Sequence, residues 1–184
     1  MDARGGFEPT GEETLFEGRV ITLARASFRA PNGESFVREI VHHPGAVAVL
    51  PLHDDQSITM VRQFRAALGH TILEIPAGLR DVDGEPPIIT ASRELAEEVG
   101  LAAGKLAPLC VFHNSPGFAD ELVHVFLATD LHSVDLDRQG VEEQHMTIER
   151  IPLESVVARI DRGEITDAKT VLAVALVQAR SRTS

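Results

Sequence analysis

The chain has 184 residues, of which 43% are hydrophobic and 24% are charged, a balance typical of a globular protein with a buried core. Its formal net charge of −11 disfavours a nucleic-acid backbone or an anionic membrane as the main partner. A single cysteine excludes an internal disulfide, and the N-terminal stretch MDARGGFEPTGEE lacks the apolar core of a secretory signal. No apolar run reaches the length of a membrane span. We therefore expect a cytoplasmic protein.

Short β-leaning runs occupy most of the chain. After a polar, Gly-rich tail over 1–13, strands are expected within 15–31 and 35–43, joined by the hairpin signal Asn32-Gly33. Further strands are expected at 46–52, 57–64, 71–77, 105–113, 121–131 and 146–151. Helices are expected at 87–99, from Leu153 until Gly163 stops the helix, and at 167–181. This order indicates an α+β protein or an α/β sandwich.

The helix at 87–99 is well marked at both ends. Pro86 and Pro87 suit a first helical turn, where a missing N–H costs nothing, and Gly100 suits a left-handed C-terminal cap. An apolar stripe is expected along one side, made of Ile88, Ala91, Leu95 and Val99.

The other side of this helix carries like charges. Glu94, Glu97 and Glu98 share one arc, and Glu94 and Glu98 are spaced so that they repel each other. No lysine between residues 78 and 100 relieves this repulsion, although Arg93 lies one turn before Glu97. Two interpretations remain open: a solvated helix face, or carboxylates that share a divalent cation such as Mg²⁺ with a substrate phosphate.

From Glu85 onward the residues read E-x7-R-E-L-x-E-E-x-G-L, which resembles the Nudix box of the Nudix hydrolases. The part from Arg93 to Leu101 matches at every specified position. One departure is visible: six residues lie between Gly78 and Glu85, where the usual pattern has five. The runs VRQFR (61–65), LEIPAG (73–78) and SPGFADE (115–121) resemble the ADP-ribose pyrophosphatase branch of that family.

The resemblance implies an α/β/α sandwich of the Nudix fold with an N-terminal antiparallel β extension. It divides the chain into an N-terminal tail and strands at 1–45, which are expected to form a homodimer, and a Nudix hydrolase domain at 46–184. It also implies Mg²⁺-dependent hydrolysis, with Mn²⁺ as an alternative ion, of the diphosphate linkage of ADP-ribose to AMP and ribose 5-phosphate by a metal-activated water. The partner is then a small nucleoside diphosphate sugar, with no nucleic acid or membrane.

The same resemblance assigns the metal ligands. Glu94 and Glu98 are expected to hold the metal, Glu97 to support them, and the backbone carbonyl of Ala77 to supply a further ligand. Arg93 is expected to orient the acidic residues, with Glu85 either acting through it or binding the metal through water.

A general base is expected in the loop 137–145. Glu142 and Glu143 are the candidates, and the family pattern favours Glu142. Without the resemblance, either side chain would be interpreted as a solvated loop acid.

Substrate contacts are expected from residues that precede the helix at 87–99 in the sequence and from one that follows it. Arg65 is expected to contact the diphosphate or the terminal ribose, and its alternative is a surface charge. Arg38 and Glu39 are expected to reach the adenine from the partner subunit. Because the chain has no Trp or Tyr, a Phe must stack on the base, and Phe16 and Phe28 are equal candidates. Phe118 is expected to line the ribose side.

Other functions compete with this prediction. A related hydrolase would act on GDP-mannose or NADH, and a sensor of this fold would bind ADP-ribose without cutting it. A structural Ca²⁺ site is disfavoured because the alternating ligands of an EF-hand loop are missing from the sequence. Since every carboxylate of the box is present, the enzyme is favoured.

Overall fold

The computed structural model describes residues 4–137 and 141–182. The chain folds into two compact units. The first comprises Met1–Gly45 and His113–Leu122, and the second comprises Ala46–Phe112 and Val123–Ser184. The segment 113–122 therefore joins the N-terminal strands, a grouping that the sequence did not suggest.

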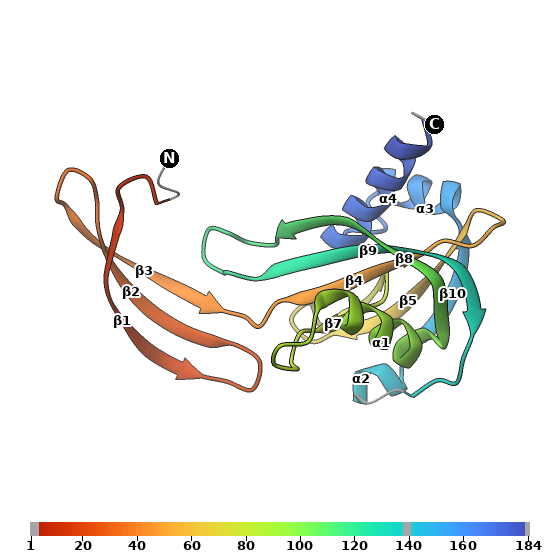
Figure 1. The fold of residues 1–184 in the computed structure, drawn as a ribbon, viewed down its shortest axis with the longest axis horizontal. Coiled ribbons are helices and arrows are strands. Elements are labelled where there is room, and N and C mark those ends of the chain that lie inside the picture. The colour runs from red at the N-terminus through yellow and green to blue at the C-terminus, as the bar shows by residue number, and fades with distance from the viewer. Residues whose placement is uncertain (1–3, 138–140, 183–184) are drawn as a thin grey trace. The chain divides into compact units, whose positions relative to one another are not determined.

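The first unit contains an antiparallel sheet in the order β1-β2-β3 (Figure 1). Its strands are β1 (Glu8–Glu17), β2 (Thr22–Arg29) and β3 (Ser35–His42). The predicted hairpin between β2 and β3 is confirmed, with Gly33 at φ 85° in the turn. The prediction of a loose tail over 1–13 is wrong from Glu8 onward. β1 is exposed along its whole length and is held in place by its hydrogen-bond ladder with β2. Because neither side of β1 is buried, its sequence has no alternation of apolar and polar residues.

The segment 113–122 packs along the end of β3. The Val41 amide donates to the Phe118 carbonyl at 2.8 Å, and the Asp120 amide donates to the Val41 carbonyl at 3.2 Å. The Asp120 carboxylate accepts a hydrogen bond from the His43 amide at 2.9 Å and lies 2.6 Å from His42 Nδ1. These contacts fix residues 118–120 against β3.

The second unit contains a four-stranded sheet in the order β7-β4-β9-β8 and a three-stranded sheet in the order β10-β5-β6. The strands of the first sheet are β4 (Ala46–Pro51), β7 (Ala77–Leu79), β8 (Leu101–His113) and β9 (Leu122–Ser133). Those of the second are β5 (Ser57–Arg65), β6 (His70–Glu74) and β10 (Thr147–Pro152). β4 runs parallel to β9 and antiparallel to β7, so the larger sheet is mixed.

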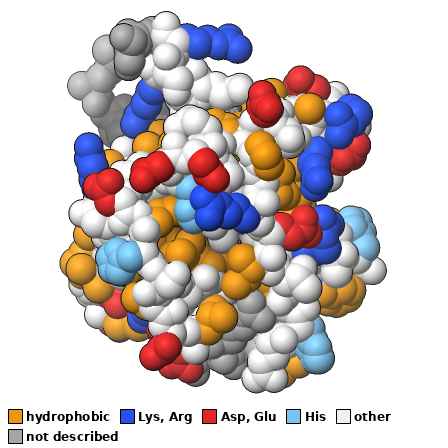
Figure 2. All heavy atoms as spheres, turned by 90° about the vertical axis from the view of Figure 1, so that its right-hand side faces the viewer, with side chains coloured by type: hydrophobic (Ala, Val, Ile, Leu, Met, Phe, Trp, Pro, Cys, Tyr) orange, Lys and Arg blue, Asp and Glu red, His pale blue; other side chains and the backbone are white. Residues whose placement is uncertain are grey.

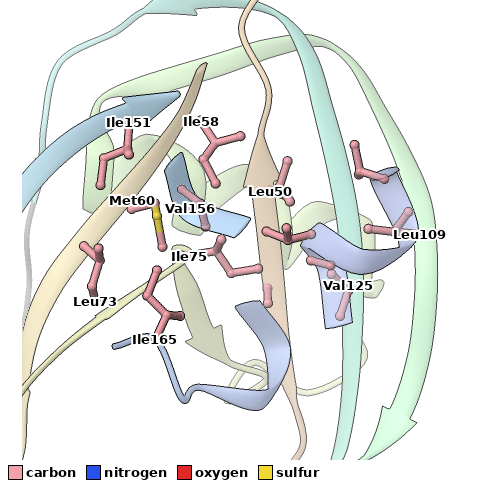
Figure 3. Close-up of a cluster of buried hydrophobic side chains, with 14 of the residues drawn as sticks. Leu50, Ile58, Met60, Leu73, Ile75, Leu109, Val125, Ile151, Val156 and Ile165 are labelled. Carbon is pink, nitrogen blue, oxygen red and sulfur yellow. The ribbon is translucent and has the colours of Figure 1, made fainter. Parts of the chain in front are cut away.

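Helices cover both sides of these strands. Figure 1 shows α1 (Pro87–Val99) on one side and α3 (Leu153–Asp161) and α4 (Ala168–Ser181) on the other. Ala91, Leu95 and Val99 of α1 pack on one apolar cluster with β4 and β9. A second cluster joins both sheets to α3 and α4, and Figure 3 shows its members pointing toward one another. The α/β/α sandwich is therefore confirmed.

The helix predicted at 87–99 is confirmed, and Gly100 ends it at φ 64° with its amide bonded to the Ala96 carbonyl. Ile88 is exposed, so it does not belong to the buried stripe. The strand predicted at 71–77 is instead divided at Ile75 and Pro76. The chain leaves one sheet after Glu74 and enters the other at Ala77. A short helix, α2 (Val141–Gln144), lies in what the sequence indicated as a loop.

No helix among residues 4–137 and 141–182 is long and apolar enough to cross a membrane. On the face drawn in Figure 2, Lys and Arg side chains lie beside Asp and Glu side chains. The described residues on that face form no continuous basic surface of the kind that binds nucleic acid.

Candidate active site

Two carboxylates of α1 are buried. Glu98 is 3% exposed and Glu94 is 8% exposed, whereas Glu97 lies nearer the surface. Carboxylates are rarely buried unless they are paired or bind a cation. A solvated helix face is therefore excluded for Glu94 and Glu98.

Glu98 is fixed by the backbone of the preceding strand. The Ala77 amide donates to Glu98 Oε2 at 3.0 Å. Burial raises the pKa of Glu98 to about 8, and the charges of Glu94 and Glu143 act in the same direction. The bond from Ala77 and the charge of Arg65 oppose this rise in pKa. The side chain is thus placed where a cation would favour its charged form.

Glu94 lies directly over Gly78. A Cβ atom at residue 78 would be 2.0 Å from the Glu94 carboxyl carbon, so any other residue there would displace this carboxylate from its observed position. Burial raises the pKa of Glu94 to about 7, partly offset by Arg93. Gly78, the last residue of the run LEIPAG, therefore has a steric function that the sequence pattern alone did not reveal.

Arg93 connects the acidic side chains. Its Nη1 donates to Glu94 Oε1 at 2.8 Å and to Glu97 Oε2 at 3.1 Å, so the predicted pair with Glu97 is present. Its Nη2 donates to Glu85 Oε2 at 3.3 Å. Because Glu85 reaches Arg93 despite the additional residue in the loop, the altered spacing leaves this contact intact. Arg93 therefore orients three carboxylates.

The donor set fits a hard divalent cation. Mg²⁺ takes oxygen ligands and binds through one or two carboxylates together with water and substrate phosphates. Glu94 and Glu98 supply two such carboxylates, both buried and both with a raised pKa. Across residues 4–137 and 141–182, no group of three His, Cys, Asp or Glu side chains is arranged to hold a metal by itself. Metal binding by Glu94, Glu98, Glu97 and the Ala77 carbonyl stays a prediction.

The two candidate bases differ in their surroundings. Both lie on α2, where Glu142 is exposed and Glu143 is half-buried. The negative charge of Glu143 raises the pKa of both Glu94 and Glu98. This electrostatic effect on Glu94 and Glu98 favours Glu143 as the general base, whereas the family pattern favoured Glu142. Which one is the base stays a prediction.

Arg65 is bound to a buried acid. Its Nε and Nη2 donate to the two carboxylate oxygens of Glu74, each at 2.8 Å, and Glu74 is fully buried. Lys169 Nζ also donates to Glu74, and the charge of Glu98 stabilises the Arg65 guanidinium. Sequence reasoning missed Glu74 and Lys169. The signal was available for Glu74, because a carboxylate in the apolar run TILEIPA requires a buried cation.

Four of the predicted substrate contacts line one cavity of the first unit. The cavity has a volume of about 390 Å³, and its lining includes Phe28, Arg38, Glu39 and Phe118. The Phe28 and Phe36 rings stack at 5.4 Å, and the Arg38 guanidinium lies 4.9 Å from the centre of the Phe36 ring. Phe16 does not line this cavity. Of the two phenylalanines that the sequence left equal, Phe28 lines this cavity, and stacking of either ring on the base stays a prediction.

The predicted metal ligands, Arg93, Arg65 and both candidate bases belong to the second unit, and the four cavity residues belong to the first. Within the second unit, a buried acidic helix face lies against a strand end.

Comparison with known proteins gives the family to which the chain belongs. The model of the NUDIX domain matches residues 42–173. The chain therefore belongs to the Nudix hydrolase family and is an enzyme.

Its relatives narrow this class. The chain is 45% identical over 169 residues to the ADP-ribose pyrophosphatase of Bacillus subtilis (strain 168), covering 92% of this chain and 91% of the relative. It is 42% identical over 177 residues to the ADP-ribose pyrophosphatase of Mycobacterium tuberculosis (strain ATCC 25618 / H37Rv), covering 96% and 86%. A crystal structure of an ADP compounds hydrolase superposes with a TM-score of 0.83 at 25% identity, covering 96% of this chain and 95% of the other.

Replacing Gly78 with alanine is expected to displace the Glu94 carboxylate, because the new methyl group would occupy its position. We expect Mn²⁺ binding, measured by isothermal titration calorimetry, to weaken by about 10–100-fold, as when the support of a ligand is lost. Gly11→Ala is the matched control, since a Cβ at residue 11 meets no atom within 4 Å. Unchanged Mn²⁺ affinity in Gly78→Ala would show that metal binding does not depend on the observed position of the Glu94 carboxylate.

Proposed function

We propose that this protein hydrolyses the diphosphate linkage of ADP-ribose, giving AMP and ribose 5-phosphate, with Mg²⁺ or Mn²⁺ as the cofactor. The observation that carries the proposal is the pair of buried carboxylates, Glu94 and Glu98, on the helix of the Nudix box. The names of the two relatives with more than 40% identity support ADP-ribose as the substrate.

The cation is needed because the substrate and the protein are both negatively charged. A diphosphate diester has two negative charges, and the chain has a net charge of −11. A divalent cation held by Glu94 and Glu98 would neutralise the diphosphate and lower the pKa of a coordinated water. Arg93 keeps the acidic side chains oriented, and the Ala77 amide keeps Glu98 in place.

The proton of the attacking water requires an acceptor that is not already bound to the cation. We assign this role to Glu143, because its charge is coupled to those of Glu94 and Glu98. Water attacks one phosphorus, its proton passes to the Glu143 carboxylate, and the bond to the bridging oxygen breaks. Positioned general bases contribute about 10²–10⁴-fold to such steps.

The adenine is assigned to this cavity of the first unit, supplied by the partner subunit of the proposed homodimer. Phe28 offers a ring for stacking, and the side chains of Arg38 and Glu39 offer a donor and an acceptor for the edge of the base. Arg65 is assigned to the phosphates, since Glu74 binds its Nε and Nη2 and the described contacts leave Nη1 without a partner. A homodimer formed through the N-terminal strands is also proposed, and the fully exposed edge strand β1 supports it.

The test is an assay of phosphate release, coupled to a phosphatase, with ADP-ribose, GDP-mannose and NADH in the presence of Mg²⁺ or Mn²⁺. We expect ADP-ribose to be cleaved with the highest kcat/KM. Faster cleavage of GDP-mannose or NADH would refute the substrate assignment and leave the family unaffected. If no substrate were cleaved while ADP-ribose still bound, the protein would be a sensor.

Phe28→Ala is expected to raise KM for ADP-ribose by about tenfold with little change in kcat, because stacking of a base on an aromatic ring is worth about 1–3 kcal/mol. Steady-state kinetics measure both constants. The same substitution at Phe16, which lies outside the cavity, should leave KM within about twofold of the wild-type value. The opposite pattern would move the stacking to Phe16.

A further inference from the structure

Every residue of the segment 74–78 has a specific contact, and the segment ends at the carboxylates of α1. The Ala77 amide donates to Glu98, and Gly78 makes room for Glu94. Upstream, the Pro76 carbonyl accepts a hydrogen bond from the Val49 amide at 2.9 Å. Downstream, β7 pairs with β4, with Ala77 opposite Ala48 and Gly78 opposite Val47. Residues 74 and 75 are held by other elements, and their contacts complete the placement of Ala77 and Gly78.

The first turn of α4 holds residue 75. Asp167 caps this helix, accepting from the Thr170 amide at 3.0 Å and from the Thr170 hydroxyl at 2.6 Å. The Thr170 hydroxyl in turn accepts a hydrogen bond from the Ile75 amide at 2.9 Å. Thr170 is fully buried, so no water replaces this contact.

The same turn holds residue 74. Lys169 Nζ donates to Glu74 and also to Asp167, the latter at 2.8 Å. Glu74 is fully buried and bound on its other side by Arg65. A buried carboxylate that loses one of its cations is strongly destabilised, so Lys169 restricts where Glu74 can lie.

We propose that the first turn of α4 is a positioning element for the metal site. Lys169 and Thr170 fix Glu74 and Ile75 and thereby, together with the pairing of β7 to β4, set the places of Ala77 and Gly78 beside Glu98 and Glu94. Neither residue is expected to touch metal or substrate. The inference rests on the proposed function in so far as Glu94 and Glu98 hold the cation.

The experiment compares Lys169→Met and Thr170→Val with the wild type. Mn²⁺ affinity is measured by calorimetry, and amide hydrogen exchange at Ile75 and Ala77 is measured by NMR in the metal-free protein. Each variant should weaken Mn²⁺ binding by about 10–100-fold, the usual effect of losing an outer partner of a metal ligand. Exchange at both amides should accelerate by roughly tenfold or more, because their hydrogen bonds open more often.

Two conservative variants and two controls complete the design. Lys169→Arg and Thr170→Ser keep the charge and the hydroxyl, and should restore Mn²⁺ affinity to within about threefold of the wild-type value. Lys105→Met removes the chain's other lysine, which is exposed on β8, and Thr59→Val removes a buried hydroxyl bonded to His53 at 2.8 Å. Both controls should bind Mn²⁺ normally.

A lower melting temperature with unchanged Mn²⁺ affinity and unchanged exchange at Ala77 would reduce the role of this turn to general stability and overturn the proposal. If Lys169→Met did not fold, Thr170→Val would decide by the same two measurements. If the wild type itself bound no Mn²⁺, the proposed function would fail, and exchange at Ala77 in the variants would still decide the positioning.

Discussion

Glu143→Gln is expected to lower kcat for ADP-ribose by about 10²–10⁴-fold while KM and Mn²⁺ affinity stay close to the wild-type values. The amide has the shape of the carboxylate but cannot accept the proton of the attacking water. Glu143 is favoured because it is half-buried and its charge raises the pKa of Glu94 and Glu98. Steady-state kinetics and calorimetry on the same preparation separate turnover from binding.

Glu142→Gln is the matched variant, because it removes the same charge one residue away on the exposed side of α2. Its kcat should stay within about threefold of the wild-type value. A slow Glu142→Gln beside a normal Glu143→Gln would make Glu142 the base, as the sequence pattern favours. Two normal variants would place the base elsewhere on the chain.

Glu98→Gln is expected to have the largest effect on the metal site. It removes one of the two buried carboxylates proposed to hold the cation. We expect kcat to fall by roughly 10³-fold or more, because in the proposed mechanism the cation neutralises the charge of the diphosphate. Mn²⁺ affinity should fall in parallel. An active Glu98→Gln enzyme with normal Mn²⁺ binding would contradict the assignment of Glu98 as a ligand.

The same substitution is expected to change how the stability of the metal-free protein depends on pH. Folding raises the pKa of Glu98 from its ordinary value of 4.5 to about 8, so the folded state binds the proton more tightly than the unfolded state. The resulting stabilisation is complete below the unfolded pKa and is lost as the pH rises through about 8. Glutamine does not titrate, so this loss should be smaller in the variant.

Thermal unfolding in the presence of EDTA, followed from pH 5 to pH 9, measures this difference. Glu94 contributes in both proteins, because its pKa is also raised, to about 7. We therefore expect the wild-type melting temperature to fall more steeply toward pH 9 than that of Glu98→Gln. Added Mn²⁺ should stabilise the wild type most at high pH, where both carboxylates are charged. Parallel curves for the two proteins would show that Glu98 is not buried as described.

The sequence determined the local features of this protein. The two prolines, the apolar spacing and Gly100 defined α1 at residues 87–99, and Asn32-Gly33 defined the β2–β3 hairpin, because caps and turns depend on neighbouring residues only. The pattern from Glu85 to Leu101 also identified the family and the glutamates of interest. Helical periodicity gives the side of a helix on which a residue lies, but it does not give what packs against that side.

Only the tertiary structure decided which charged side chains are buried and which groups contact them. Glu94 and Glu98 are buried because β7 lies against α1. The Ala77 amide meets Glu98 across 21 residues of sequence, a contact that no local pattern specifies. Glu74 meets Lys169 across 95 residues of sequence, and the Ile75 amide meets Thr170 across the same separation. Such pairs form only when the strands and α4 have packed, since the burial that makes them favourable exists only in the folded chain.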